Sequence, residues 1–542
     1  MLRGLCTVVS VVALMAAVVP HRFAAAQRAT PAAMVGNDAC RPCHQSIYDS
    51  YQRTAMARTS GSAFPPLEGS FRHAASGVSY RVYREGQSAL LAYDRADNPS
   101  LHGTQPLKYY VGSNTRGRTF LLEIEGFLYQ APINHYAARN VWDMSPGYWD
   151  VTAMQLNHPV DATCLFCHAS RVQPPRAGTL NGFPAVAFLQ NGVACERCHG
   201  GGSEHVKGAG KMVNPSRLSG ERRDSVCVQC HLEGEARITR AGRSEEDYKP
   251  GDLLSDTLAI FVRENATNER RGAVSHVESL AASLCKQKSG DALSCLTCHD
   301  PHVQPGRDAR PTYYRGKCVG CHAPQAARHH PDQPDCTVCH MPRMDSADIS
   351  HTVVTDHRIL RTPLPDRPLT SGVGRLVPFG NSVAEPRELG LAYGEVALRG
   401  NASAAAESLR LLEQALRRYP DDADVLTRLG YLHQASGDMN AAERDYAHAL
   451  RTDPNRAIAA ADLGVFYARR GLLQQALDLW RPTFDKNPQL SELGINVATA
   501  LCGTGDIDGA RAALRRVLTH NPDLAIARQS LADLTTARCP AK

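Results

Sequence analysis

The pattern of apolar and polar positions changes twice along the 542-residue chain. From about residue 76 to residue 136, apolar and polar residues alternate in short runs separated by glycine, as in residues 78–83 (VSYRVY) and 119–124 (TFLLEI). Alternation with a period of two is typical of half-buried β-strands. We therefore predict a small β insertion over about 76–136.

A longer period begins after residue 386. Proline recurs every 34 residues, at Pro420, Pro454, Pro488 and Pro522. The pair Leu429-Gly430 recurs as Leu463-Gly464, and small or bulky residues occupy the positions where two packed helices need them. This repeat is typical of a tetratricopeptide array, an α-solenoid of helix pairs, which we predict over 386–542. Such an array either offers a concave surface to a partner protein or packs on the rest of the chain.

Between these two regions, glycine, proline and short helical runs dominate, and residues 359–385, which include Pro363, Pro365 and Pro368, are predicted to be a linker. We expect a mainly α protein with few regular elements in its central part, residues 27–358, apart from the β insertion.

The first residues are typical of a secretory signal peptide: Arg3, an apolar run from Leu5 to Pro20, and three alanines at 24–26. We predict removal of residues 1–26 and a periplasmic or other extracytoplasmic location. The apolar run is shorter than the roughly 20 residues of a membrane-spanning helix. No later stretch is long and apolar enough, so we expect no membrane span in the mature chain.

Composition changes this picture little. The formal charge is +6 and the pI is near 8.5. No run of lysine and arginine with interleaved aromatic residues accompanies that charge, so a nucleic-acid partner is not expected.

The cysteines define the chemistry. Eighteen cysteines in an exported chain would ordinarily indicate disulfides, but fourteen of them lie in seven Cys-x-x-Cys-His motifs. The motifs are Cys40/Cys43/His44, Cys164/Cys167/His168, Cys195/Cys198/His199, Cys227/Cys230/His231, Cys295/Cys298/His299, Cys318/Cys321/His322 and Cys336/Cys339/His340.

This spacing suits covalent haem, because the two thiols reach the vinyl groups and the following imidazole reaches the iron. Zinc sites and thioredoxin-type redox pairs also use Cys-x-x-Cys, but neither requires the histidine. We predict seven c-type haems with these cysteines as thioether links and these histidines as proximal ligands. The last six motifs begin within residues 164–336, so their haems should pack closely.

The distal ligands are expected among eleven further histidines between Cys40 and His357. His205 and His302 each follow a motif too closely to reach back to its own ring, which favours a neighbouring ring, and His351 and His357 follow the last motif in the same way. Methionine would raise the potential, and we favour histidine pairs.

Several stretches resemble multihaem cytochromes with a C-terminal tetratricopeptide region, whose haem domain is similar to the tetrahaem cytochromes that accept electrons from hydroxylamine oxidoreductase. The matching stretches are 142–148 (WDMSPGY), 195–206 (CERCHGGGSEHV), 213–237, the segment around 275–278, 294–302 (SCLTCHDPH) and 339–361. The resemblance implies distal ligation by His73, His205, His276, His302, His351 and His357, with His330 as a further candidate.

One departure from these relatives stands at Arg116, where several carry histidine. One iron would then lack a sixth ligand or take His135 or His158. We therefore carry two functions forward: an electron relay with redox partner proteins, and an oxidoreductase that acts on nitrite, hydroxylamine or a similar small species at one open iron, with Arg116 and Arg118 binding an anion. The chain has no Cys-x-x-Cys-Lys motif, which disfavours nitrite reduction. A scaffold with purely structural haems is a third, weaker reading.

Overall fold

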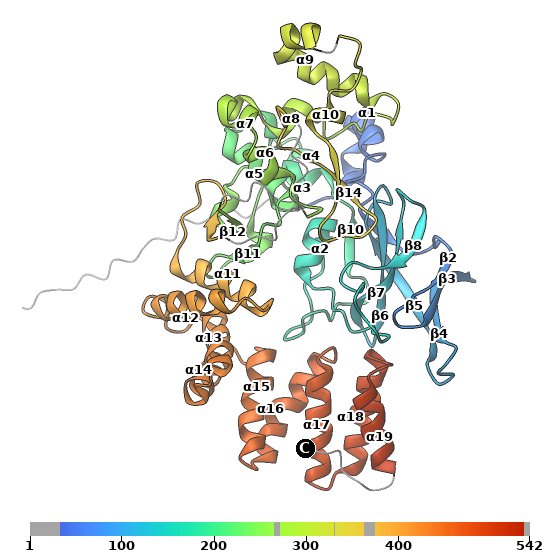
Figure 1. Ribbon diagram of the computed structural model, residues 1–542, viewed down its shortest axis with the longest axis vertical. Helices are drawn as coiled ribbons and strands as arrows, with labels where there is room; N and C mark the ends of the chain where they lie inside the picture. Colours follow the sequence, from blue (N-terminus) through green and yellow to red (C-terminus); the bar gives the residue numbers. More distant parts are fainter. Residues whose placement is uncertain (1–32, 265–271, 330, 363–373, 536–542) are drawn as a thin grey trace, which may run out of the picture.

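The computed structural model describes residues 33–264, 272–329, 331–362 and 374–535, so the predicted signal peptide and His330 lie outside the described residues. Short helices fill the upper and central part of the molecule, a β-sheet lies beside them, and a curved array of helices lies below (Figure 1). No helix among the described residues is long and apolar enough to cross a membrane.

The large sheet is antiparallel, with the strand order β2-β3-β4-β5-β6-β7-β8 and with β1 paired to β5. Its strands are β1 (Ser60–Ser62), β2 (Gly69–Arg72), β3 (Val78–Glu85), β4 (Ser88–Arg95), β5 (His102–Val111), β6 (Gly117–Ile124), β7 (Phe127–Tyr136) and β8 (Val141–Met144). Alternating side chains such as Val78, Tyr80 and Val82 are buried in its core.

This sheet is larger than the small insertion that the alternation predicts, and a mainly α description understates it. The first two strands and the last are only three or four residues long, too short to alternate visibly. They join the sheet through pairing with longer strands, as β2 does with β3 and β8 with β7.

The motif region consists of short helices and three small sheets. The helices are α1 (Arg41–Tyr51), α2 (Ala162–His168), α3 (Cys195–His199), α4 (Ser203–Val206), α5 (Gly220–His231), α6 (His276–Ala281), α7 (Leu284–Ser289), α8 (Cys295–Cys298), α9 (Arg310–His329) and α10 (Thr337–His340). The strands are β9 (Ala169–Val172) with β10 (Phe188–Asn191), β11 (Ala236–Thr239) with β12 (Leu258–Arg263) and β15 (Leu376–Pro378), and β13 (Arg343–Asp345) with β14 (Val353–Thr355). Strand β15 lies inside the stretch predicted as a linker, where pairing with β12 gives its backbone hydrogen-bond partners.

The array after residue 386 consists of antiparallel helix pairs. Its helices are α11 (Pro386–Leu398), α12 (Ala402–Leu416), α13 (Ala423–Ser436), α14 (Met439–Thr452), α15 (Ala457–Arg469), α16 (Leu473–Lys486), α17 (Ser491–Gly503), α18 (Ile507–His520) and α19 (Ala525–Thr535). The repeated glycine has a packing reason: a Cβ at Gly430 would lie 2.6 Å from the Tyr446 ring, and one at Gly464 would lie 2.1 Å from the Trp480 ring. Only glycine lets the two helices of each pair approach so closely.

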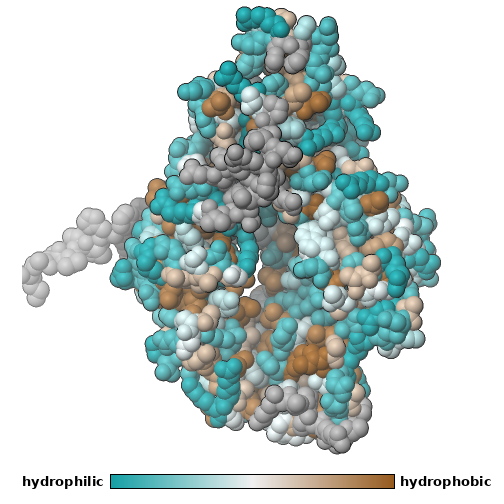
Figure 2. Space-filling view, viewed as in Figure 1, coloured by the Kyte–Doolittle hydropathy of each residue, from teal (hydrophilic) through white to brown (hydrophobic). Residues whose placement is uncertain are grey.

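The array contacts the rest of the chain at both ends. At one end α11 packs on β11, β12 and β15, and Arg387, which is only 3% exposed, donates to the carbonyl oxygen of Thr239 at 2.9 Å. At the other end Asp523, before α19, accepts from Arg95 of β4 at 2.7 Å. The outer surface is largely hydrophilic, and apolar residues gather in the hollow between the array and the parts above it (Figure 2). The array therefore bridges two separate parts of the molecule.

Candidate haem sites

The motifs, numbered here as sites one to seven in chain order, each stand on a short helix or at the end of a longer one. The helix places its two cysteines about one turn apart, so both thiols project from the same side. At sites one and six the histidine itself departs from helical geometry, with φ −120° and ψ 35° at His44 and φ −113° and ψ 29° at His322. The helical backbone is therefore interrupted at the histidine, directly after the second cysteine of the motif.

The motif cysteines differ in how far the protein chain covers them. Ten of the fourteen are partly buried, but Cys43, Cys164, Cys321 and Cys339 are exposed. Three of these, Cys43, Cys321 and Cys339, are the second cysteines of sites one, six and seven, whose helices α1, α9 and α10 lie at the outer end of the molecule (Figure 1).

The close packing predicted for the haems of the last six motifs stays a prediction. The protein chain by itself leaves Cys43, Cys321 and Cys339 exposed. The motif spacing could not reveal the difference, because it is the same at exposed and partly buried sites. Exposure still leaves a thiol free to reach a vinyl group, so the thioether role of these cysteines stays a prediction.

Four motif histidines face a histidine from elsewhere in the chain. His44 faces His205 with ring centres 6.3 Å apart, and His199 faces His302 at 5.9 Å. The remaining two pairs are His231 with His276 at 6.1 Å and His299 with His357 at 6.3 Å. The ring planes of the first two pairs are 21° and 11° from parallel, whereas those of His231 and His276 are 86° apart.

These separations test whether the residues fit a haem iron. Two metal–nitrogen bonds of about 2 Å, with roughly 1 Å from each nitrogen to its ring centre, give about 6 Å between the centres of two axial imidazoles. All four pairs have that spacing, so the residues fit the group, and these histidines would hold the iron from its two faces.

Hydrogen bonds at Nδ1 orient several of these rings. The Nδ1 atoms of His199 and His340 lie 2.7 Å from the carbonyl oxygens of Val213 and Leu360, and that of His168 lies 2.9 Å from the Thr59 hydroxyl. A ring that donates from Nδ1 presents Nε2 as the free lone pair for a metal. The sequence carries no mark of the two carbonyl partners, because any residue can supply a backbone oxygen.

Two of the histidines that face a motif histidine are oriented in the same way, by hydrogen bonds at Nδ1. The Nδ1 atom of His205 lies 3.0 Å from the Gly210 carbonyl oxygen, and that of His357 lies 2.8 Å from the Thr355 carbonyl oxygen. His276 differs, because its Nδ1 is buried without a hydrogen-bond partner among the described residues.

Two of the predicted distal histidines lie elsewhere. His351 contacts Asp143 at the end of β8, with 2.6 Å between Nε2 and the carboxylate. The Nδ1 atom of His73 lies 2.9 Å from the Ser76 hydroxyl. Burial lowers the pKa of His73, and the negative charge of Asp143 partly offsets this shift. In these contacts His351 pairs with Asp143 and His73 with Ser76, and neither faces a motif histidine.

The two histidines proposed as substitutes at the Arg116 position are also engaged elsewhere. His135 is buried in β7, with its ring nitrogens 3.0 Å from the side-chain oxygens of Asn114 and Asn140. His158 packs edge-on against Tyr148, with ring centres 5.0 Å apart. Neither faces a motif histidine in these contacts.

Arg116 itself reaches the cluster around site four. It stands in the hairpin between β5 and β6, where Gly112 (φ 92°) and Asn114 (φ 59°) adopt left-handed backbone conformations. Burial, followed by the nearby His357 and Arg116, lowers the pKa of His276 to about 3. Burial also lowers the pKa of Arg116, whose residue surface is nevertheless exposed.

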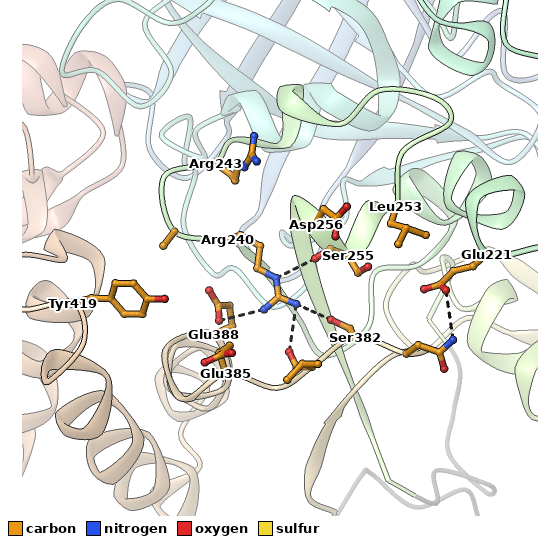
Figure 3. A pocket seen from close by; sticks show the side chains of 13 residues that line it. Glu221, Arg240, Arg243, Leu253, Ser255, Asp256, Ser382, Glu385, Glu388 and Tyr419 are labelled. Carbon is orange, nitrogen blue, oxygen red and sulfur yellow. Dashed lines mark hydrogen bonds and ion pairs between the residues drawn. The ribbon is translucent and has the colours of Figure 1, made fainter. Parts of the chain in front are cut away.

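A cavity of 580 Å³ lies at the junction of the motif region and the array, away from the motifs (Figure 3). Arg240 stands at its centre and donates to the carbonyl oxygen of Ser255 (3.0 Å), the hydroxyl of Ser382 (2.8 Å) and the carboxylate of Glu388 (3.3 Å). The arginine is satisfied by the chain itself, so this cavity is a structural joint.

Comparison with known proteins fits these sites. The family described as cytochrome c554 and c-prime matches residues 134–200, which contain sites two and three. The multihaem cytochrome MtrA of Shewanella baltica is 26% identical over 179 residues, which cover 30% of this chain and 52% of MtrA. The high-molecular-weight cytochrome c of Nitratidesulfovibrio vulgaris is 24% identical over 201 residues, which cover 33% of this chain and 36% of that protein.

The chain thus spans about half or less of the length of these curated relatives. Together with the seven motifs, these matches support a multihaem c-type cytochrome with a role in electron transfer. A structure of MamA from Desulfovibrio magneticus is 18% identical and covers 28% of this chain and 85% of its own, with a TM-score of 0.25. A TM-score this low does not establish the fold of the repeats.

Proposed function

We propose that the chain binds seven c-type haems and relays electrons through them outside the cytoplasm, from one redox partner protein to another. The observation that carries this proposal is the set of four histidine pairs with ring centres 5.9–6.3 Å apart. A haem iron held by two histidines exchanges one electron and has no position open to a substrate. Paired histidines also favour low potentials, because methionine ligation would raise them.

The protein's own part is to hold the rings without rearrangement. Carbonyl oxygens fix the imidazoles of His199 and His340, so the ligands keep their orientation when the charge at the site changes. The helical array, which we propose to be a tetratricopeptide domain, would dock a partner on the surface that its end contacts leave free.

The test is an electron paramagnetic resonance spectrum of the fully oxidised, purified protein, with the haem content counted chemically on the same sample. Seven haems with low-spin signals are expected for a relay. Fewer than seven haems, or predominantly high-spin signals, would contradict it.

A second function is favoured by the position of Arg116. Alongside burial, the positive charge of Arg116 lowers the pKa values of His231, His276 and His357, and among the described residues no carboxylate pairs with this arginine. An unpaired guanidinium beside a haem site would attract an anion. Because His231 and His276 already have the spacing of an axial pair, an oxidoreductase for nitrite, hydroxylamine or a similar species would need His276 to leave the iron of site four.

The same spectrum separates the two functions. A high-spin haem that shifts when nitrite or hydroxylamine is added, and that no longer shifts in Arg116→Gln, would establish the second function. The matched control is Arg84→Gln in β3, where the guanidinium donates to the Gly86 carbonyl oxygen at 2.9 Å and lies over the Phe64 ring.

A further inference from the structure

We propose that electrons follow the spatial order one, three, four, five, six, seven, with site two attached at the side of sites three and four. This inference rests on the proposed relay function and gives it a path with two solvent-facing ends. Transfer between redox centres falls steeply with distance, so the contacts between motifs decide which neighbours exchange electrons.

Site one lies against site three, although site two is its neighbour in sequence. The Asn37 side chain accepts from the backbone N–H of Cys195 at 2.9 Å. Glu196, only 3% exposed, accepts from the backbone N–H groups of Val35 and Gly36, each at 2.8 Å.

Site three continues to site four. The side chain of Gln229, which lies within motif four and is 2% exposed, donates to the carbonyl oxygen of Arg197 within motif three at 3.4 Å. These two residues stand between the cysteines of their motifs, so the two haem attachments are adjacent.

Sites four and five share a row of imidazoles. His231 faces His276, His276 packs edge-on against His357 at 4.9 Å, and His357 faces His299. The row joins the two proximal ligands through the two distal ones.

Sites five, six and seven follow through α9. The Tyr314 hydroxyl lies 3.3 Å from Nδ1 of His299, which ties the helix of site six to site five. At the next residue, Arg315 donates to Cys336 Sγ at 3.8 Å and to the Gln333 carbonyl oxygen at 2.8 Å, which ties it to site seven.

Site two is attached beside this series. The Arg197 guanidinium donates to the Phe166 carbonyl oxygen at 2.9 Å and covers the Phe166 ring at 3.6 Å, which joins site two to site three. The Cys167 thiol contacts the Gln229 carbonyl oxygen at 4.0 Å, which joins it to site four. An electron can pass directly from three to four, so site two is not needed on the way.

The two ends of the series face solvent. Residues 41–47 of site one are exposed, as are residues 320–325 of site six and Val338 of site seven, at 63%, and each of these three motifs has an exposed second cysteine. Site two differs, because Leu165 and Phe166 inside its motif are buried even though its first cysteine is exposed. Exchange with partners is therefore expected at site one and at the tip formed by sites six and seven.

The test injects electrons at one end and detects them at the other. Ala327→Cys, at an exposed position of α9, carries a photoreducing ruthenium label, and His205→Ala opens the iron of site one to carbon monoxide as a spectral reporter. A flash should produce the carbon monoxide complex of reduced site one.

Removing site five (Cys295→Ala with Cys298→Ala) should slow this arrival at least tenfold. Removing site two (Cys164→Ala with Cys167→Ala) should slow the arrival by a factor at least ten times smaller than the removal of site five does. Equal slowing in the two variants, or fast arrival without site five, would overturn the proposed order.

A milder pair covers the case in which a haem-deleted chain does not fold. His302→Met should raise the potential of site three and trap the electron there, with all haems retained, and slow the arrival at least tenfold. Unchanged arrival overturns the order. If the labelled parent itself never reduces the reporter, it is the relay function that fails.

Discussion

His199 and His302 face each other with ring centres 5.9 Å apart and planes 11° from parallel, although one closes the third motif and the other follows the fifth. Their alignment depends on how two short helices pack, since each ring lies at or just beyond a helix end. The first prediction tests this pair.

His302→Ala should convert one low-spin haem to high spin while leaving the covalent haem count unchanged, because the thioethers and His199 remain. Electron paramagnetic resonance and a haem count on the same sample measure both quantities. His102→Ala is the matched control, because that side chain is exposed on the sheet and bonded to Pro99. An unchanged spectrum in the first variant removes His302 from the ligand set.

Gly112→Ala should destabilise the hairpin that carries Arg116. The backbone φ at this position is 92°, and a Cβ there would lie 2.5 Å from the Gly117 carbonyl oxygen, so both strain and a clash arise. We expect a loss of about 1–3 kcal/mol in the free energy of unfolding, measured by thermal unfolding. Gly86→Ala has positive φ (58°) but nothing within 4 Å, so its loss should be smaller. Equal losses would show that the clash is unimportant.

Asp523→Ala should loosen the attachment of the array to the sheet. The buried carboxylate accepts from Arg95 at 2.7 Å, from the backbone N–H of Met154 at 3.1 Å and from Arg528 of α19, and removing it leaves these donors without this partner. Breaking a buried ion pair costs about 3–5 kcal/mol, and we expect increased hydrogen exchange in β4 and α19. Asp523→Asn should lose less because it keeps an acceptor.

The control for this variant is Asp508→Ala, where the side chain is 94% exposed. If Asp523→Ala behaves like Asp508→Ala, the array is not held at this point.

Acidification should destabilise the fold at the neighbouring pair of Glu125, between β6 and β7, and His520 of α18. Burial lowers the pKa of His520, which Glu125 only partly offsets. Burial would raise the pKa of Glu125, but the hydrogen bond from Arg516 and the proximity of His520 bring it below its ordinary value. For both groups the unfolded chain binds the proton more tightly, so stability is lost as the pH falls, first below about 6.5 and again below about 4.5.

His520→Phe should flatten the upper part of this profile, between about pH 7 and pH 5, because phenylalanine keeps the contacts with the Phe127 and Tyr129 rings and cannot take a proton. Thermal unfolding at several pH values measures it. The same exchange at His448, whose side chain is 33% exposed on α14, should change the profile less. Identical profiles for wild type and His520→Phe would assign the pH dependence to other groups.

Local sequence alone predicts the attachment chemistry, because Cys-x-x-Cys-His is a contiguous motif whose geometry depends on one helical turn. It also predicted the helix pairs after residue 386, since glycine at Gly430 and Gly464 has to meet the facing Tyr446 and Trp480 at a fixed offset. The alternating strands were visible for the same reason: their period is local.

Tertiary structure decided what depends on distant parts of the chain. Which histidine faces which motif, the placement of site one on site three, the exposure of the outer attachment cysteines, and the engagement of His351 at Asp143 all depend on residues far apart in sequence. Many of the partners that fix these positions are backbone carbonyl oxygens and short strands. Residue type does not predict them, because any residue can supply a carbonyl oxygen. A single sequence therefore states which groups can bind haem, and only the packed chain brings the two ligands of each pair face to face.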